Sequence, residues 1–436
     1  MPLLNKLNEP LWVEQYLRSR KETRMKSALT WLMIFIAALF YSYEYVLRIT
    51  PSAFFNYYTY NMKLSVQAIG HVDSAYYWLY TPMQVFVGPL IDHYGVRRLL
   101  IIAVFACIIG ALFFSTNSSY ISLIIGRCFI GFGSSFAFVA VLKIASEWLP
   151  QKYFALCSGL TTALGMLGAY SGEVLLTHFV DMHGPQRTIH VLVYLGILLL
   201  VLSTIFIRNR SKPKPSHRRK RSNMLVSSLK KVMSDGQIWL IGVVGAALYM
   251  PLVIFSGLWG VPYLEHIRGF THLEAAHTAS MIFIGWLIGS PLVGMIVSRY
   301  SCKRLLLSAG CILSTVMMIA VLYLPINDIH TLSTMIFFLG LVSSPQILVF
   351  TFAFERVNKS LTATAIAVVN MIIMICGLFQ PMIGRIIEQG TVIKSVGNIT
   401  RQQFSRSHFE QAFLIIPILL LLSFLLIFMI KNQKKP

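Results

Sequence analysis

The chain has little charge for its length. Of its 436 residues only 12% are Asp, Glu, Lys or Arg, whereas 56% are hydrophobic, and the mean hydropathy is +0.68. Soluble domains carry about 25% charged residues, so this composition excludes a soluble protein and predicts an integral membrane protein. Acidic residues are scarcest, and the formal net charge is +21. Nucleic-acid binding would need a basic patch on a soluble domain, so we expect no nucleic-acid partner.

Sequence signatures of enzyme chemistry are also missing. The six cysteines have no paired spacing, which argues against a disulfide framework or a metal site. No serine stands in a nucleophile elbow, and no glycine-rich phosphate loop joins a strand to a helix. We therefore expect no enzymatic activity, no cofactor and no metal. The first apolar segment follows about 26 mostly polar residues and is as long as a full span, unlike a cleaved signal peptide.

Long apolar segments, in contrast, are abundant. Each is long enough for a hydrocarbon core of about 30 Å at about 1.5 Å per residue. With both termini in the cytosol, 28 of the 37 Lys and Arg residues lie on the cytosolic side, as the positive-inside rule requires. The twelve predicted spans lie near residues 28–50, 69–91, 99–115, 121–145, 154–176, 188–207, 238–262, 275–297, 305–324, 331–353, 362–386 and 411–430.

A short polar loop from Gly88 to Arg98 joins the second and third predicted spans. We expect Gly88 to let a neighbouring helix approach closely and Gly95 to permit a tight turn. Asp92 is suited to pair with a cation or a helix N-terminus, and Arg97 with Arg98 to hold the loop at the anionic inner surface. We interpret these five residues as a conformational switch.

A degraded copy of this loop stands at positions 294–304, which implies a duplicated fold. We therefore expect an all-α integral membrane protein with twelve transmembrane helices in two pseudo-symmetric six-helix bundles. The basic N-terminal segment is either an amphipathic helix on the inner leaflet or a disordered tail. The predicted domains are this segment at 1–27, the first bundle at 28–207, a basic cytosolic linker at 208–237, the second bundle at 238–430 and a cytosolic tail at 431–436.

The first predicted span contains two charges, Glu44 and Arg48, just before Pro51. Residues four apart lie on one helix face, so the two side chains can pair. Charges inside a membrane helix are costly unless they pair or face a wet cavity. One interpretation is a cavity site in which Arg48 receives an anionic solute group. The alternative is an interfacial ion pair beneath the outer surface, where Pro51 ends the helix.

Polar residues on other spans complete the candidate cavity. Tyr76, Tyr80 and Gln84 recur every four residues and give one face of hydroxyl and amide groups, although Tyr76 could instead join an interfacial aromatic belt. The second half has little buried charge, and most of its polar residues suit helix packing. Among them, Gln346 and Asn370 are the best candidates for contact with the solute.

Arg127 and Glu173 are two further candidate site residues within predicted spans. Arg127 is too deep to reach water easily, so it either contributes to solute binding or coupling, or hydrogen-bonds nearby carbonyls. Glu173 follows a series of glycines that favours close helix packing, and it is placed to meet Arg127 or Arg48 across the bundle.

The pattern G-x-x-x-D-x-x-G-x-R-R at Gly88 to Arg98 resembles the loop between helices 2 and 3 of the major facilitator superfamily. The pattern R-x-x-x-G-x-G that begins at Arg127 is similar to the superfamily's helix 4 motif, whose Arg is associated with proton coupling or anion binding. The run from Ser74 to Trp78 together with Arg48 looks most like the anion:cation symporter branch. This resemblance implies that Arg48 binds the carboxylate or phosphate of the solute, and that an acid near it takes part in proton coupling.

We therefore expect a secondary transporter that moves a small solute, an organic anion, by proton-coupled symport. Glu44 and Glu173 are the candidate proton carriers. Besides the solute and the proton, we expect membrane lipids as partners. We also expect a monomer in a bacterial inner membrane. An exporter of a hydrophobic compound, drug or siderophore is the alternative among transporters. A membrane enzyme and a sensor that no longer moves solute are alternatives from other classes.

Overall fold

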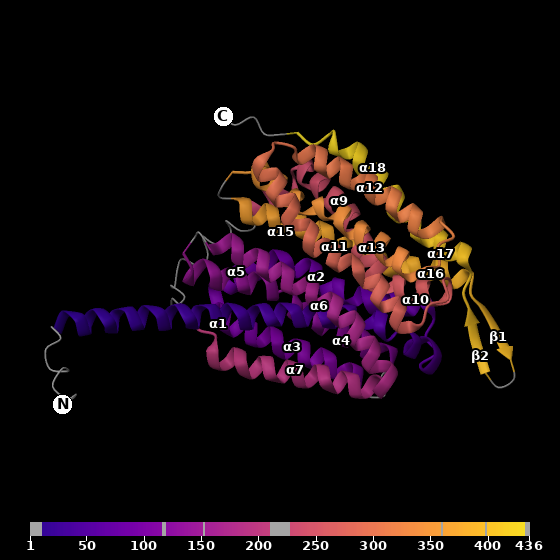
Figure 1. The fold of residues 1–436 in the computed structure, drawn as a ribbon, viewed down its shortest axis with the longest axis horizontal. Helices are drawn as coiled ribbons and strands as arrows, with labels where there is room; N and C mark the ends of the chain where they lie inside the picture. The colour runs from indigo at the N-terminus through magenta and orange to yellow at the C-terminus, as the bar shows by residue number, and fades with distance from the viewer. Residues whose placement is uncertain are drawn as a thin grey trace, which may run out of the picture.

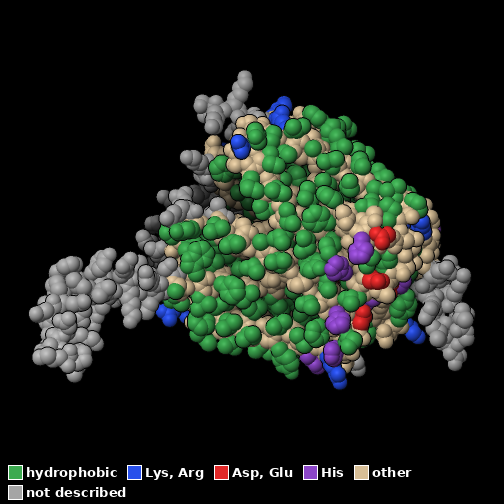
Figure 2. Space-filling model, in the orientation of Figure 1, with side chains coloured by type: hydrophobic (Ala, Val, Ile, Leu, Met, Phe, Trp, Pro, Cys, Tyr) green, Lys and Arg blue, Asp and Glu red, His purple; other side chains and the backbone are tan. Residues whose placement is uncertain are grey.

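The computed structural model describes residues 11–115, 119–150, 153–209, 227–358, 361–396 and 399–431. The twelve predicted spans are helical within these ranges, and the helices run along the long axis of the molecule (Figure 1). Hydrophobic side chains cover the broad face in view, whereas His, Asp and Glu side chains gather at one end (Figure 2). This distribution suits a bundle whose flanks face lipid and whose ends face water.

The N-terminal half contains six spans, of which α4 and α5 together form one. α1 runs through Pro51 to Ala53, so the prediction that Pro51 ends this helix is wrong. Residues 1–10 of the predicted N-terminal segment lie outside the described residues, and the rest of that segment is continuous with α1. The elements are α1 (Leu11–Ala53), η1 (Tyr57–Asn61), α2 (Val66–Tyr94), α3 (Val96–Ser115), α4 (Tyr120–Ser134), α5 (Ala137–Trp148), α6 (Phe154–His183) and α7 (Pro185–Phe206).

The C-terminal half also contains six spans, and three of them are interrupted by short π or 3₁₀ segments. Two interruptions contain a proline, Pro251 or Pro345, which lacks the N–H that would continue the helical hydrogen-bond pattern. The helices are α9 (Gly236–Met250), η3 (Pro251–Trp259), α10 (Gly260–His266), α11 (His272–Arg299), α12 (Lys303–Tyr323), α13 (Ile329–Ser343), η4 (Ser344–Ile347), α14 (Leu348–Arg356), α15 (Thr362–Met374), η6 (Ile375–Phe379), α16 (Gln380–Gln389), α17 (Arg406–Phe413) and α18 (Ile415–Ile427).

Within the described ranges, ten helical segments are long and apolar enough to be identified as membrane spans from length and composition. The other two spans of the twelve-helix fold are α2 and α6, with 29 and 30 residues. Both carry buried acidic residues, Asp73 in α2 and Glu173 in α6, which belong to the interior of the bundle.

The two halves meet at the end of the molecule that contains the end of α1, the start of α2 and the end of α16, which we call the closed end. There Asn56 Nδ2 donates to the two carboxylate oxygens of Glu265 at 2.9 and 3.0 Å. Asp181 of α6 and His272 at the start of α11 are paired at 2.9 Å. These contacts join the N-terminal half to the C-terminal half.

At the opposite end, three ion pairs join helices of the same half: Asp92 with Lys143, Lys303 with Glu355, and Arg356 with Asp235. Gly88 also lies in this part of α2, and a Cβ added to it would meet no atom within 4 Å. The prediction that Gly88 allows a close helix approach is therefore wrong for this structure.

Two segments between spans contain regular secondary structure. Residues 210–226 of the predicted linker lie outside the described part of the chain, but 227–233 are helical and α9 begins at Gly236. The segment 387–410, between the last two spans, contains an antiparallel hairpin of β1 (Val392–Val396) and β2 (Ile399–Gln403), in which Val392 pairs with Gln403. The hairpin projects from the closed end (Figure 1).

Candidate functional site

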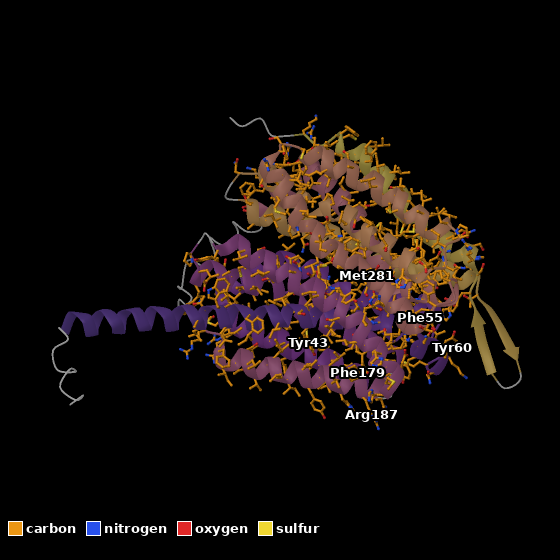
Figure 3. The ribbon with its side chains drawn as sticks, viewed as in Figure 1. Tyr43, Phe55, Tyr60, Phe179, Arg187 and Met281 are labelled. Carbon is orange, nitrogen blue, oxygen red and sulfur yellow. The ribbon has the colours of Figure 1, made fainter. Side chains whose placement is uncertain are left out.

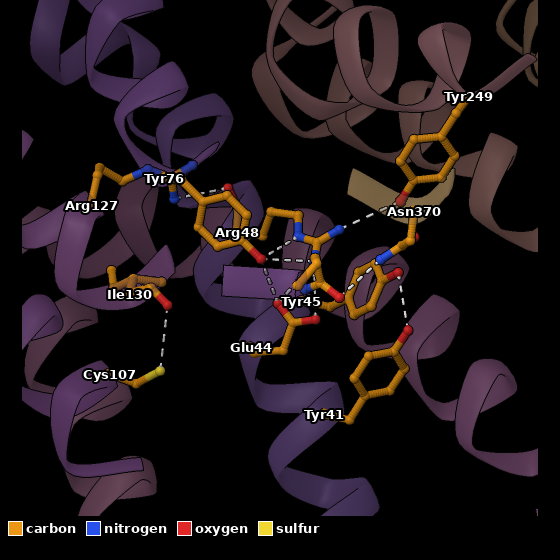
Figure 4. A network of polar contacts seen from close by, with 11 residues as sticks. Tyr41, Glu44, Tyr45, Arg48, Tyr76, Cys107, Arg127, Ile130, Tyr249 and Asn370 are labelled. Atoms are coloured by element: carbon orange, nitrogen blue, oxygen red, sulfur yellow. Dashed lines mark hydrogen bonds and ion pairs between the residues drawn. The ribbon is translucent and has the colours of Figure 1, made fainter. Parts of the chain in front are cut away.

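Arg48 and Glu44 form the centre of a buried polar network on α1 (Figure 4). Arg48 Nη2 donates to the two carboxylate oxygens of Glu44 at 3.1 and 3.3 Å, as their spacing predicts. Arg48 is 6% exposed and Glu44 is fully buried. The bundle therefore encloses the pair, and neither charge lies on its lipid-facing surface.

Tyr76 of α2 connects both members of this pair. Its hydroxyl accepts from Arg48 Nη2 at 2.8 Å and from Arg48 Nε at 3.1 Å, and it donates to Glu44 Oε2 at 3.2 Å. The Tyr76 side chain is fully buried, so it does not belong to an interfacial belt. Its ring stacks on that of Tyr80, with centroids 5.1 Å apart.

Aromatic rings surround the guanidinium of Arg48. Its central carbon lies 4.4 Å from the ring centroid of Tyr45 and 5.2 Å from that of Tyr80. Cation–π contacts of this kind solvate a positive charge where water is scarce. The arginine thus remains charged in the bundle interior, with one carboxylate as its counter-ion.

The network crosses from one half to the other at two places. Arg48 Nη1 donates to the hydroxyl of Tyr249 in α9 at 3.4 Å. Asn370 of α15 donates through Nδ2 to Gln84 Oε1 of α2 at 3.0 Å. Gln84 and Asn370, both predicted to line the cavity, therefore meet each other. The site therefore lies between the halves.

Arg127 forms a second buried network instead of facing Arg48. Its Nη2 pairs with Asp73 Oδ1 at 2.6 Å, and its Nη1 donates to the carbonyls of Leu47 and Arg48 at 2.9 and 3.0 Å. Because Pro51 has no N–H to donate four residues back, the carbonyl of Leu47 needs another partner, and Arg127 supplies it. Of the two roles predicted for Arg127, hydrogen bonding to nearby carbonyls is the one observed in this structure.

Close packing of α4 on α2 makes the Arg127 network possible. A Cβ added to Gly131 would lie 2.0 Å from the carbonyl oxygen of Tyr76, so only glycine fits there. Asp73 was not predicted from the sequence as the partner of Arg127. The sequence did contain an indication of this pair, because Asp73 lies within a predicted span and a buried acid needs a cation as its partner.

Glu173 lies on α6 facing Ser52 of α1, and the structure does not bring it to Arg127 or Arg48. It is fully buried, and its carboxylate oxygens have no hydrogen-bond partner among the described residues. α6 can approach α1 closely because Gly168 has no Cβ. A Cβ at this position would lie 2.5 Å from the carbonyl oxygen of Ser42. Burial of a charged carboxylate without a hydrogen-bond partner is costly, so a negative charge is unfavourable at this position.

The other predicted residues lie apart from the Arg48 network. Gln346 is in η4 and 4% exposed. Gly95 has φ +85° and ends α2 with its N–H bonded to the Ile91 carbonyl, which confirms the tight turn. The guanidinium of Arg97 donates to the Thr204 carbonyl at 2.8 Å, whereas Arg98 is exposed.

Comparisons with known proteins agree with this architecture. A family model described as Major Facilitator Superfamily matches residues 30–381. The probable galactarate/D-glucarate transporter GudP of Bacillus subtilis (strain 168) is 24% identical over 308 residues, which cover 62% of this chain and 65% of that protein. The probable sulfoacetate transporter SauU of Cupriavidus necator is 21% identical over 341 residues, 72% of this chain and 77% of that protein. The match to the putative transporter AraJ of Escherichia coli (strain K12) covers 60% of that protein. The chain therefore spans less than two thirds of the length of both AraJ and GudP.

Solved structures show the same fold at low sequence identity. A mutant of the nucleoside transporter NupG matches with a TM-score of 0.72 at 12% identity, covering 93% of this chain and 100% of that one. A bacterial homologue of the human lysosomal transporter Spinster, in an inward-facing and occupied conformation, gives a TM-score of 0.70 at 12% identity and covers 91% and 96%. Because the family model matches well over half of the residues, the chain belongs to the major facilitator superfamily, a family of transporters and not of enzymes.

Proposed function

We propose that this secondary transporter carries a small organic anion together with a proton, by alternating access between its two halves. The observation that supports the proposal best is the placement of Arg48. Its guanidinium lies in the interior between the halves, and its only carboxylate partner among the described residues is Glu44, one helical turn away. A solute carboxylate or sulfonate can compete for the same guanidinium edge.

The proposed coupling follows from this competition. A solute anion that binds Arg48 displaces Glu44, and the displaced carboxylate then lies buried without a counter-ion. Such a group is stabilised by taking up a proton, while the Tyr76 hydroxyl is free to donate to the solute. Binding of the anion and binding of the proton therefore favour each other, which is the thermodynamic requirement for symport.

The names of two relatives favour an organic anion. GudP is named for galactarate and D-glucarate, and SauU for sulfoacetate. All three solutes are small and carry carboxylate or sulfonate groups, which match a buried arginine. Export of a hydrophobic compound is the second candidate, supported by the aromatic rings of Tyr45, Tyr76 and Tyr80 around the site.

Transport assays separate these functions. Purified protein in liposomes should show saturable counterflow of galactarate, glucarate or sulfoacetate, and no counterflow of a neutral hexose. Saturable transport of a hydrophobic cation, unaffected by these anions, would support the exporter instead. A sensor or an enzyme would give no counterflow of any solute.

We also propose a monomer in the bacterial inner membrane with both termini cytosolic, so that the closed end faces outward. Cysteines introduced at Asp328 and Tyr300 test the orientation, because the two positions lie at opposite ends of α12. We expect a membrane-impermeant thiol reagent to label Asp328→Cys in intact cells and Tyr300→Cys only after lysis. The reverse pattern would invert the proposed topology.

Asp92→Asn is expected to slow transport and to change equilibrium solute affinity by no more than a few-fold. Asp92 Oδ1 accepts from Lys143 Nζ at 2.7 Å, far from Arg48 and at the end opposite the closed end. We propose that Asp92 helps to hold the halves together there when the closed end opens, as in the family it resembles. Single-turnover uptake and equilibrium binding of labelled solute measure the two quantities.

Glu147→Gln is the matched control for this variant, because Glu147 also pairs with Lys143, at 3.2 Å. If Asp92 holds the two halves together, and does not merely neutralise Lys143, Glu147→Gln should transport solute at a nearly normal rate. Loss of solute binding in Asp92→Asn, with unchanged populations of the two conformations, would contradict the switch and assign the loop to the binding site.

A further inference from the structure

A groove of about 420 Å³ lies between α2 and the segment formed by η6 and α16, so both halves line it. α2 contributes Gln67, His71, Ser74 and Trp78, which share one face of the helix. Gln67 is the second residue of α2, and α2 begins at the closed end. The groove therefore extends from the closed end.

This groove faces away from the Arg48 network. At about 100° per residue, His71 and Trp78 lie on the side of α2 opposite to Tyr76 and Tyr80. Trp78 is 46% exposed, and Met382 of the other half is 44% exposed. Large exposed apolar side chains on the flank of a membrane-spanning bundle face lipid, so the groove opens toward the bilayer.

Arg385 lines the groove and has no hydrogen bond or ion pair with any residue that the structure describes, although it lies in the span 362–389. The nearest acid on its own helix, Glu388, is occupied, because its carboxylate accepts from the backbone N–H of Gln67 at 2.9 Å. The His71 ring likewise has no partner among the described residues. An arginine in a membrane segment requires water or an anion to solvate it.

The depth of Arg385 indicates which anion is at hand. It lies four residues before the end of α16 at Gln389, which corresponds to about 6 Å along the helix. A residue about one turn from the end of a membrane-spanning helix lies near the level of the lipid headgroups. Met382 lies about one turn deeper and Leu378 about two turns deeper, so we expect their apolar side chains to lie against acyl chains.

We propose that this groove binds the phosphodiester headgroup of a membrane phospholipid. Arg385 donates to two phosphate oxygens, His71 supplies a further donor from the other half, and Trp78 with Met382 contacts an acyl chain. Because the two halves share the groove, the bound lipid favours the conformation in which they meet at the closed end. The lipid is a structural ligand, separate from the transported solute.

Native mass spectrometry of the purified full-length protein tests this site, with dioctanoylphosphatidylglycerol as the probe. We expect one saturable lipid adduct, and Arg385→Gln should weaken its binding by about tenfold or more, as expected for loss of a charge-assisted hydrogen bond. Arg187→Gln is the matched control, because Arg187 is also exposed and points outward from α7 (Figure 3), a helix that does not line the groove. Its lipid binding should equal that of the wild type.

Two further probes identify the source of the phosphate. Dioctanoylglycerol, which lacks the phosphate, should bind at least tenfold more weakly, and excess inorganic phosphate should not displace the phospholipid. Equal binding of dioctanoylglycerol, or unchanged binding in Arg385→Gln, would overturn the proposal and show that Arg385 merely reaches water. Displacement by inorganic phosphate would make this a site for free anions and equally overturn it.

Discussion

Arg48→Lys is expected to weaken solute binding by about ten- to a hundredfold. Lysine keeps the positive charge but loses the planar fork that binds two oxygens at once, and charge-assisted contacts of this kind contribute about 1.5–3 kcal/mol. Arg48→Ala should abolish detectable transport, since Glu44 would then be buried without a counter-ion and the solute without an anchor. Equilibrium binding and uptake of a labelled organic anion measure both effects.

Arg268→Lys is the matched control for this substitution. Arg268 is also a buried arginine with several hydrogen bonds, but it donates to Tyr263 and to carbonyls such as that of Leu322 in the C-terminal half. We expect it to lower the thermal stability without changing solute affinity. Normal transport by Arg48→Ala would contradict the anion-binding role of Arg48 and favour the exporter.

Glu44→Gln is expected to abolish accumulation driven by a proton gradient while sparing counterflow exchange. Glutamine keeps the shape of the side chain and its hydrogen bonding to Tyr76, but it cannot take up a proton when the solute occupies Arg48. Exchange of solute for solute needs no net proton movement, so it should continue. Uptake with and without an imposed pH gradient, compared with counterflow, separates the two activities.

Glu173→Gln distinguishes the two candidate proton carriers. Glu173 is buried and unpaired with any described residue, and glutamine resembles its neutral acid form. If Glu44 carries the proton, Glu173→Gln should retain most of the gradient-driven accumulation. Loss of accumulation in Glu173→Gln with normal accumulation in Glu44→Gln would reverse the assignment.

Local features of the site were predictable from the sequence. The four-residue spacing of Glu44 and Arg48 places them on one helix face whatever the rest of the fold does, and their pairing is observed. The turn at Gly95 was predictable for a similar reason, because a positive φ is a property of one residue and favours glycine. Twelve apolar segments and a repeated loop were sufficient to predict the fold.

Contacts between distant helices were not predictable in this way. Tyr249 reaches Arg48, and Asn370 reaches Gln84, only because the two halves pack in one particular orientation. The expected contact of Glu173 with an arginine failed because α6 turns this residue toward Ser52 instead. Such contacts depend on the rotation of each helix about its axis, which helical periodicity alone does not determine.

The surroundings of Gly88 are open in this structure, because a Cβ added to it would meet no atom within 4 Å. The ion pairs described at the Asp92 end join helices of the same half. The sequence does not distinguish between two conformations of one chain. A role for Gly88 in close packing is therefore a prediction only for the alternative state.

Movement of protons driven by the solute tests the central claim most directly. Proteoliposomes that contain a trapped pH indicator are given an inward gradient of a transported organic anion, with no initial pH gradient and with the membrane potential clamped. We expect acidification of the interior with wild-type protein, and none with Glu44→Gln, although this variant still exchanges solute. An unchanged internal pH during saturable anion uptake by the wild type, or alkalinisation, would contradict it.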